Sequence, residues 1–120
     1  MGRYIDMKVF KKAYNLAMQI FEISKKFPEE EIYSLTDQVR RSSRSVCTNF
    51  GEAYRRRRYP AHFLSKLADS DAENTETSIW LKFALDCGYL TEVDSQRLSD
   101  ECEAIGRILG CMIQQPDKFR

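Results

Sequence analysis

Residues 91–116, TEVDSQRLSDECEAIGRILGCMIQQP, carry the signals of one complete helix from its first turn to its last. Thr91 and Asp94 have the three-residue spacing at which two side chains cap a helix N-terminus. Pro116 ends the segment, because proline cannot continue a helix. Apolar residues between these signals recur at three- and four-residue steps, namely Val93, Leu98, Cys102, Ile105, Leu109, Met112 and Ile113. The stretch predicts one amphipathic helix.

Three earlier segments repeat this pattern. The first covers residues 7–27 and ends before Pro28, and the second begins at the capping pair Ser34 and Asp37 and continues to about residue 58. The third covers residues 60–87, with Pro60 in its first turn and Gly88 as a left-handed cap. Four helices with short connections predict an all-α, antiparallel up-and-down four-helix bundle, formed as a single domain by residues 1–120.

Composition argues against β folds and against secreted or membrane proteins. Five Gly and three Pro among 120 residues are too few for the many turns of a β-sandwich or barrel. The longest apolar runs cover only a few residues, and residues 1–6 are charged where a secretory signal would be apolar. The four cysteines include no C-x-x-C pair, which favours free thiols. We therefore expect a cytoplasmic protein that does not contact a membrane.

The sequence contains no set of side chains typical of catalysis. A di-metal carboxylate centre in a bundle needs two Glu-x-x-His motifs, but His62 is the only histidine, and Glu73 and Glu76 have no partner histidine. No nucleophile has a plausible base, and no glycine-rich phosphate loop is present. We expect a non-enzymatic protein without a metal ion or another cofactor.

Charge is distributed unevenly along the chain. Residues 1–60 hold 13 Lys and Arg against 7 Asp and Glu, whereas residues 61–120 hold 6 against 11. The most basic stretch is Arg55, Arg56, Arg57 and Arg58, flanked by Tyr54 and Tyr59, and the stretch expected to lie opposite, residues 61–68, contains no acid. Guanidinium groups beside aromatic rings suit phosphate contact and base stacking, so these six residues are a candidate nucleic-acid-binding surface. A solvated helix end or a subunit contact is the alternative.

The middles of the second and third helices are polar where a bundle core is normally apolar. If the chain reverses near Pro60, residues whose numbers sum to about 119 lie at the same level, because both helices rise equally per residue. Arg41, Arg44 and Asn49 then come level with Glu73 and Glu76. We expect these five residues to form a structural network of charge-assisted hydrogen bonds rather than a ligand site.

Large apolar residues outside the main stripes predict self-association. These residues are Tyr14, Phe21, Trp80, Phe83 and Tyr89. Groups of exposed large apolar side chains usually mark interfaces.

Several motifs give the chain a family resemblance. They include Phe27-Pro28, Gln38-Val-Arg-Arg41, Ser45-Val46, Asn49-Phe-Gly-Glu52-Ala53, Phe63-Leu64, Ser70, Glu73 and Gly88-Tyr-Leu90. The sequence resembles the bacterial four-helix-bundle proteins encoded by intervening sequences of large-subunit ribosomal RNA genes, a family that includes the accessory variability protein of diversity-generating retroelements. The glycine at position 51 stands earlier than in the family's usual order.

The resemblance implies a ring-shaped homopentamer and, in the retroelement branch, a basic surface that engages nucleic acid and a reverse transcriptase. We therefore expect a homo-oligomeric bundle that associates with RNA, DNA or a ribonucleoprotein partner through its arginines. The alternative is a structural protein–protein adaptor without nucleic-acid binding, in which the arginines meet acidic patches of a neighbouring subunit.

Overall fold

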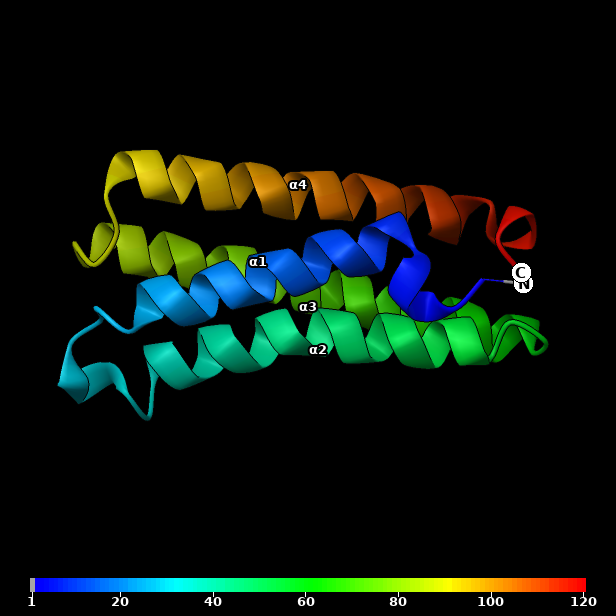
Figure 1. Cartoon of the computed structure of the whole chain (residues 1–120), viewed down its shortest axis with the longest axis horizontal. Helices are drawn as coiled ribbons and strands as arrows, with labels where there is room; N and C mark the ends of the chain where they lie inside the picture. The colour runs from blue at the N-terminus through cyan, green and yellow to red at the C-terminus, as the bar shows by residue number, and fades with distance from the viewer. Residues whose placement is uncertain (1) are drawn as a thin grey trace.

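The structure, a computed structural model, describes residues 2–120 and confirms the four-helix bundle. The helices are α1 (Lys8–Ser24), α2 (Leu35–Arg55), α3 (Pro60–Asp86) and α4 (Glu92–Gln114), and each one runs antiparallel to the next along a bundle 44 Å long (Figure 1). Short 3-10 helices precede α1 (Tyr4–Asp6), join α1 to α2 (Glu29–Glu31) and follow α4 (Pro116–Lys118). Each α-helix packs against two others, in the cyclic order α1, α2, α3, α4.

Two of the predicted helix ends are confirmed in detail. The Thr91 hydroxyl accepts a hydrogen bond from the Asp94 backbone N–H at 3.1 Å, which caps α4. Gly88 has a φ of 80° immediately after α3, a left-handed conformation that glycine adopts without a Cβ clash. Both ends follow from local chemistry, which explains why the sequence predicts them correctly.

The predicted cap of α2 is wrong. Ser34 has φ −124° and ψ −103°, outside the extended geometry of a normal N-cap, and its side chain makes no capping bond. Its hydroxyl instead donates to the Glu31 carboxylate at 2.5 Å, and the same carboxylate accepts from the Leu35 backbone N–H at 3.3 Å. Glu31, four residues before the first residue of α2, therefore caps the helix in place of Ser34 and Asp37.

The core lies along the bundle axis and draws on all four helices. The side chains of Ile20, Val39, Phe50, Phe63, Leu67, Leu98, Ile105 and Leu109 are completely buried. Burial of each such side chain contributes roughly 1.5–3 kcal/mol to the free energy of folding. All four cysteines are free, and burial raises the pKa of Cys47 to about 11 and that of Cys102 to about 12, so both stay protonated thiols at neutral pH.

Small polar residues occupy the middle of the α2–α3 contact. The Ser70 hydroxyl donates to the Val46 carbonyl, and the Thr77 hydroxyl donates to Ser42, both at 2.8 Å. Asn74 extends this seam to α4, where its amide donates to the Cys102 carbonyl at 2.9 Å. The polar middle is therefore a set of neutral hydrogen bonds that lets α2 and α3 approach closely. Within residues 2–120, no helix is both long enough and apolar enough to cross a membrane.

Candidate nucleic-acid interface

The four consecutive arginines lie at the end of α2 and on its connection to α3. Helix α2 ends at Arg55, and the chain then turns through residues 56–58 before Pro60 begins α3. Two backbone hydrogen bonds of 2.9 Å fix this turn, from Arg56 to the Ala53 carbonyl and from Tyr59 to the Arg56 carbonyl. The predicted continuation of α2 to residue 58 is wrong, and Arg56, Arg57 and Arg58 consequently lie on a turn rather than around a helix.

Arg57 differs from its three neighbours because it packs against the protein. Its Nε donates to the Tyr54 carbonyl at 2.8 Å, and its guanidinium carbon lies 3.6 Å from the centre of the Tyr54 ring. This is a cation–π contact on a partly buried side chain. Arg57 therefore holds the turn against the end of α2.

Tyr54 is a correction to the predicted surface. Its side chain is only 7% exposed and its ring stacks on Phe50, with the ring centres 6.0 Å apart. Tyr54 follows Phe50 by four residues, which places both on the core-facing side of α2. A ring covered by Phe50 on one side and Arg57 on another has no free face for a base.

The other predicted residues lie in the solvent. Arg55, Arg56 and Arg58 are exposed, and Tyr59 is 57% exposed beside the His62 ring. Arg56 Nη1 lies 3.4 Å from His62 Nδ1. In the described part of the chain, no carboxylate lies within 4.0 Å of any of the four arginines. Their charge is therefore available to an external partner.

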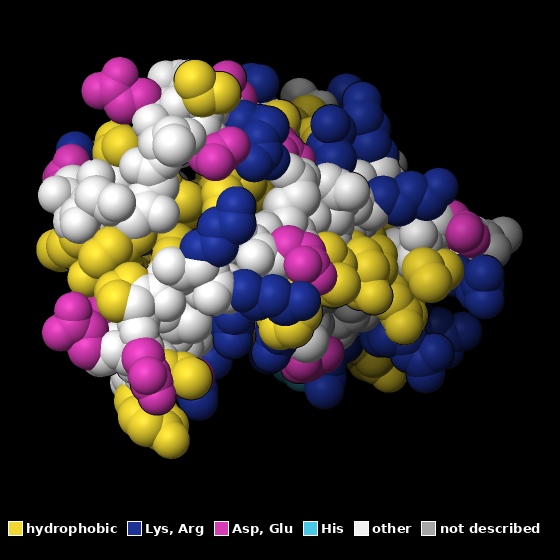
Figure 2. Space-filling model, turned by 60° about the vertical axis from the view of Figure 1, so that its left-hand side comes forward, with side chains coloured by type: hydrophobic (Ala, Val, Ile, Leu, Met, Phe, Trp, Pro, Cys, Tyr) yellow, Lys and Arg dark blue, Asp and Glu magenta, His cyan; other side chains and the backbone are white. Residues whose placement is uncertain are grey.

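The antiparallel topology adds further cations to the same end of the molecule. The start of α1 and the end of α4 lie beside the α2–α3 connection (Figure 1). They contribute Arg3, Lys8, Lys11, Lys12, Arg107, Lys118 and Arg120. Dark blue side chains accordingly gather on the right of Figure 2, toward this end. We call these residues, with Arg55–Arg58, the basic end.

The opposite end of the bundle is acidic. When each helix is divided at its midpoint, residues 2–16, 46–73 and 104–120 hold 12 Lys and Arg against 6 Asp and Glu. Residues 17–45 and 74–103 hold 7 against 12. The net charges are thus +6 toward the basic end and −5 toward the other. Reasoning from the sequence missed this grouping, although the alternating direction of the four helices would have shown it.

Glu31 and Tyr89 join the two connections at the acidic end. The Tyr89 hydroxyl donates to the Glu31 carboxylate at 2.9 Å. This bond is the main reason that the pKa of Tyr89 rises to about 12. The pKa of Glu31 is lowered, first by the hydrogen bond from Ser34 and then by the one from Tyr89.

The predicted charged network inside the bundle is wrong. In the described residues, no salt bridge joins Arg41 or Arg44 to Glu73 or Glu76. Asn49 bonds instead to Ser45 on its own helix, at 2.9 Å, and to Lys66 at 3.4 Å.

Helix faces explain this difference. Arg41 and Arg44 are exposed on the outer side of α2, and Glu76 accepts from Trp80 Nε1 at 3.3 Å. Level matching predicts height along the bundle but not the direction of a side chain. The α2 face toward α3 is formed by Ser42 and Val46.

Comparison with known proteins supports the fold and identifies the family. A crystal structure of a protein with unknown function from the S23 ribosomal protein family, from Bacteroides thetaiotaomicron VPI-5482, has a TM-score of 0.80 and 25% sequence identity, covering 88% of this chain and 97% of that one. No curated protein matches the chain. The family model of the 23S rRNA-intervening sequence protein matches residues 5–111. The chain therefore belongs to the 23S rRNA-intervening sequence protein family.

Proposed function

We propose that this protein is a non-enzymatic, homo-oligomeric bundle that associates with nucleic acid through its basic end. The observation that carries the proposal is the convergence of unpaired arginines with the lysines and arginines of both chain ends on one end of the molecule. Surfaces of this kind attract the phosphate backbone irrespective of sequence. RNA is the first ligand to test, since the family takes its name from an rRNA sequence.

Phosphate contact is the role that suits this surface. Arg55 at the end of α2 and Arg56 and Arg58 on the following turn are exposed, so their guanidinium groups can reach neighbouring phosphates. Tyr59 supplies one exposed ring beside them for a base. Base stacking on Tyr54 is excluded from the proposal, because the ring of Tyr54 is buried.

The salt dependence of binding tests the proposal. The variant Arg55→Gln/Arg56→Gln/Arg58→Gln removes three exposed charges and keeps the structural Arg57. Counterion release gives a slope of log affinity against log salt of about −0.7 to −0.9 per phosphate contacted, so the slope should become shallower by up to about 2 to 3. Fluorescence anisotropy with generic RNA and DNA oligonucleotides measures this slope.

A matched control removes three charges from the other half of the bundle. The variant Lys25→Gln/Lys82→Gln/Arg97→Gln should keep the parent slope, because these residues lie away from the basic end. Equal slopes for the parent and the Arg55, Arg56 and Arg58 variant would contradict phosphate contact at this surface. Loss of self-association in that variant, with nucleic-acid binding unchanged, would support the adaptor alternative instead.

A further inference from the structure

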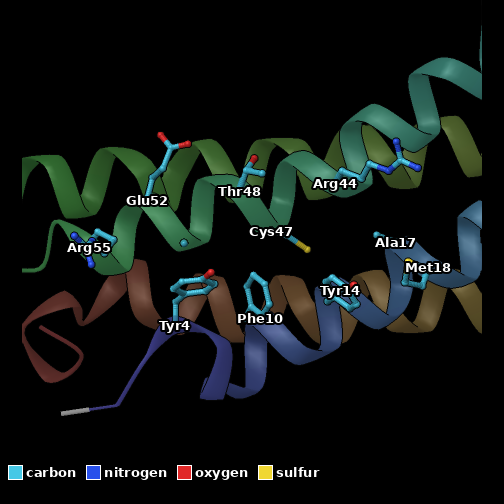
Figure 3. A pocket seen from close by; sticks show the side chains of 11 residues that line it. Tyr4, Phe10, Tyr14, Ala17, Met18, Arg44, Cys47, Thr48, Glu52 and Arg55 are labelled. Carbon is cyan, nitrogen blue, oxygen red and sulfur yellow. The ribbon is translucent and has the colours of Figure 1, made fainter.

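An open apolar groove runs between α1 and α2 beside the basic end (Figure 3). It encloses about 630 Å³ and is lined from the N-terminal side by Tyr4, Phe10, Tyr14 and Met18, and from α2 by residues that include Cys47 and Gly51. Tyr14 is 55% exposed and Met18 is 46% exposed. A contiguous surface of this kind normally contacts a partner. We call it the α1–α2 groove.

The α2 rim of this groove is cationic. Arg44 and Arg55 lie eleven residues apart on α2, which separates them by about 16 Å along the helix. Neither has a carboxylate within 4.0 Å in the described residues, and Glu52 between them is held by Lys66 at 3.1 Å. A partner that fits this groove must therefore bring apolar side chains accompanied by acids.

The outer face of α3 has this chemistry. Exposed small and apolar residues follow one another at three- and four-residue steps, namely Ala61, Leu64, Ala68, Ala72, Thr75, Ile79 and Phe83. Ile79 is 50% and Phe83 is 54% exposed. The opposite face of α3 is already buried in the core, so the helix carries apolar residues on two opposite faces, and only one of them is covered within the chain. An exposed apolar face of this kind usually marks an interface.

Acids accompany this face of α3. Asp71, Glu73 and Glu76 lie along the same stretch as Ala72 and Thr75. In the described residues none of the three has a cation within 4.0 Å. The unpaired acids of α3 thus complement the unpaired Arg41 and Arg44 of α2.

We infer that a second copy of this chain seats the outer face of its α3 in the α1–α2 groove. This inference rests on the proposed self-association and names the two surfaces that form it. Within one chain, Ser70 bonds to Val46 and Thr77 to Ser42, so Arg44 stands level with residues near Glu73 and Glu76. Two copies packed side by side without an axial shift therefore bring Arg44 of one to these acids of the other.

The same level matching places large residues against small ones. Ala68 and Ala72 of one copy come level with Cys47 and Gly51 in the groove of the other, so small side chains of α3 would face the aromatic side chains that line the groove. The groove and the α3 face are different surfaces, so the contact is heterologous and each copy keeps one free surface of each kind. When this contact repeats from copy to copy, the assembly is a ring if the rotation between neighbouring copies closes and a filament if it does not.

Two single variants test the pairing by size-exclusion chromatography with light scattering. Arg44→Glu puts a like charge opposite the acids, and Ala72→Glu puts a charged side chain into the apolar contact. Each should weaken self-association by at least about tenfold, equivalent to ~1.4 kcal/mol. Both positions are exposed, so the helical circular dichroism and the melting temperature should match the parent. Arg107→Glu and Gln96→Glu, on the exposed side of α4, are the matched controls and should stay assembled.

A mixture of the two variants gives the decisive result. Arg44→Glu retains a working α3 face and Ala72→Glu retains a working groove, so an equimolar mixture should form a one-to-one dimer that neither variant forms alone. Absence of this dimer, or unchanged assembly of both variants, would overturn the inference while leaving self-association intact. A monomeric parent at micromolar concentration would overturn self-association as well, and nucleic-acid binding would still be judged separately by its salt slope.

Discussion

Arg57 and Arg58 are adjacent in the sequence but have different surroundings. The Arg57 guanidinium lies on the Tyr54 ring and bonds to the Tyr54 carbonyl, whereas Arg58 is exposed. We expect Arg57→Gln to lower the free energy of unfolding by about 1 kcal/mol, because a cation–π contact and a charge-assisted hydrogen bond are lost together. Arg58→Gln should change it by less than about 0.5 kcal/mol. Urea denaturation of both variants checks the difference, and equal stabilities would contradict a structural role for Arg57.

At the residue scale, the sequence identifies types of side chain better than their surroundings. The run of four arginines and the exposure of Tyr59 are evident from composition and position. The burial of Tyr54 was predictable from its place four residues after Phe50, but the flanking arginines favoured the other interpretation. Arg44 shows the same limit, because level matching gives its height along the bundle but not the face of α2 on which it lies.

At the scale of the element, the two predicted helix caps lead to contrasting predictions for stability. Thr91→Ala should destabilise the protein by about 1 kcal/mol, because the Asp94 backbone N–H loses its acceptor. Ser34→Ala should have a smaller effect, since Glu31 rather than Ser34 accepts from the backbone of α2. Chemical denaturation measures both, with Ser99→Ala inside α4 as a substitution of similar size. A larger loss for Ser34→Ala than for Thr91→Ala would contradict the capping arrangement.

The four helices and their order follow from the sequence because each helix has its own signals. Apolar spacing, prolines and Gly88 act locally, so they are visible without the fold. The seam of Ser70, Asn74 and Thr77 is different, because its hydrogen bonds join helices and depend on how each helix is rotated. The α1–α2 groove is likewise formed by two elements, and neither one shows it alone.

At the scale of the whole molecule, the hydrogen bond between Tyr89 and Glu31 at the acidic end makes the free energy of unfolding depend on pH. The pKa of Glu31 is lowered from 4.5, so the hydrogen-bonded carboxylate stabilises the folded state fully above pH 4.5. This stabilisation is lost as the pH falls through the lowered pKa. The pKa of Tyr89 is raised from 10.0 to about 12, so the protonated phenol stabilises the folded state fully below pH 10. This stabilisation is lost as the pH rises toward 12.

The variant Tyr89→Phe isolates this contribution. The difference in free energy of unfolding between parent and variant should be constant from about pH 5 to pH 10 and should shrink outside that range. Urea denaturation at a series of pH values measures it. Tyr33→Phe, at a side chain 93% exposed, is the control and should show no such profile. A difference that does not change with pH would contradict the bond between the phenol and the carboxylate.

The placement of residues 2–6 and 116–120 beside the α2–α3 connection has a practical consequence for experiments on this protein. An affinity tag or fluorescent fusion at either terminus would project from the basic end, where it would obstruct a bound polymer or, if acidic, compete with it. Once the exposed native thiols Cys87 and Cys111 are replaced by serine, a label attached to a cysteine introduced at Tyr33, on the exposed connection at the far end of the bundle, would leave that surface open.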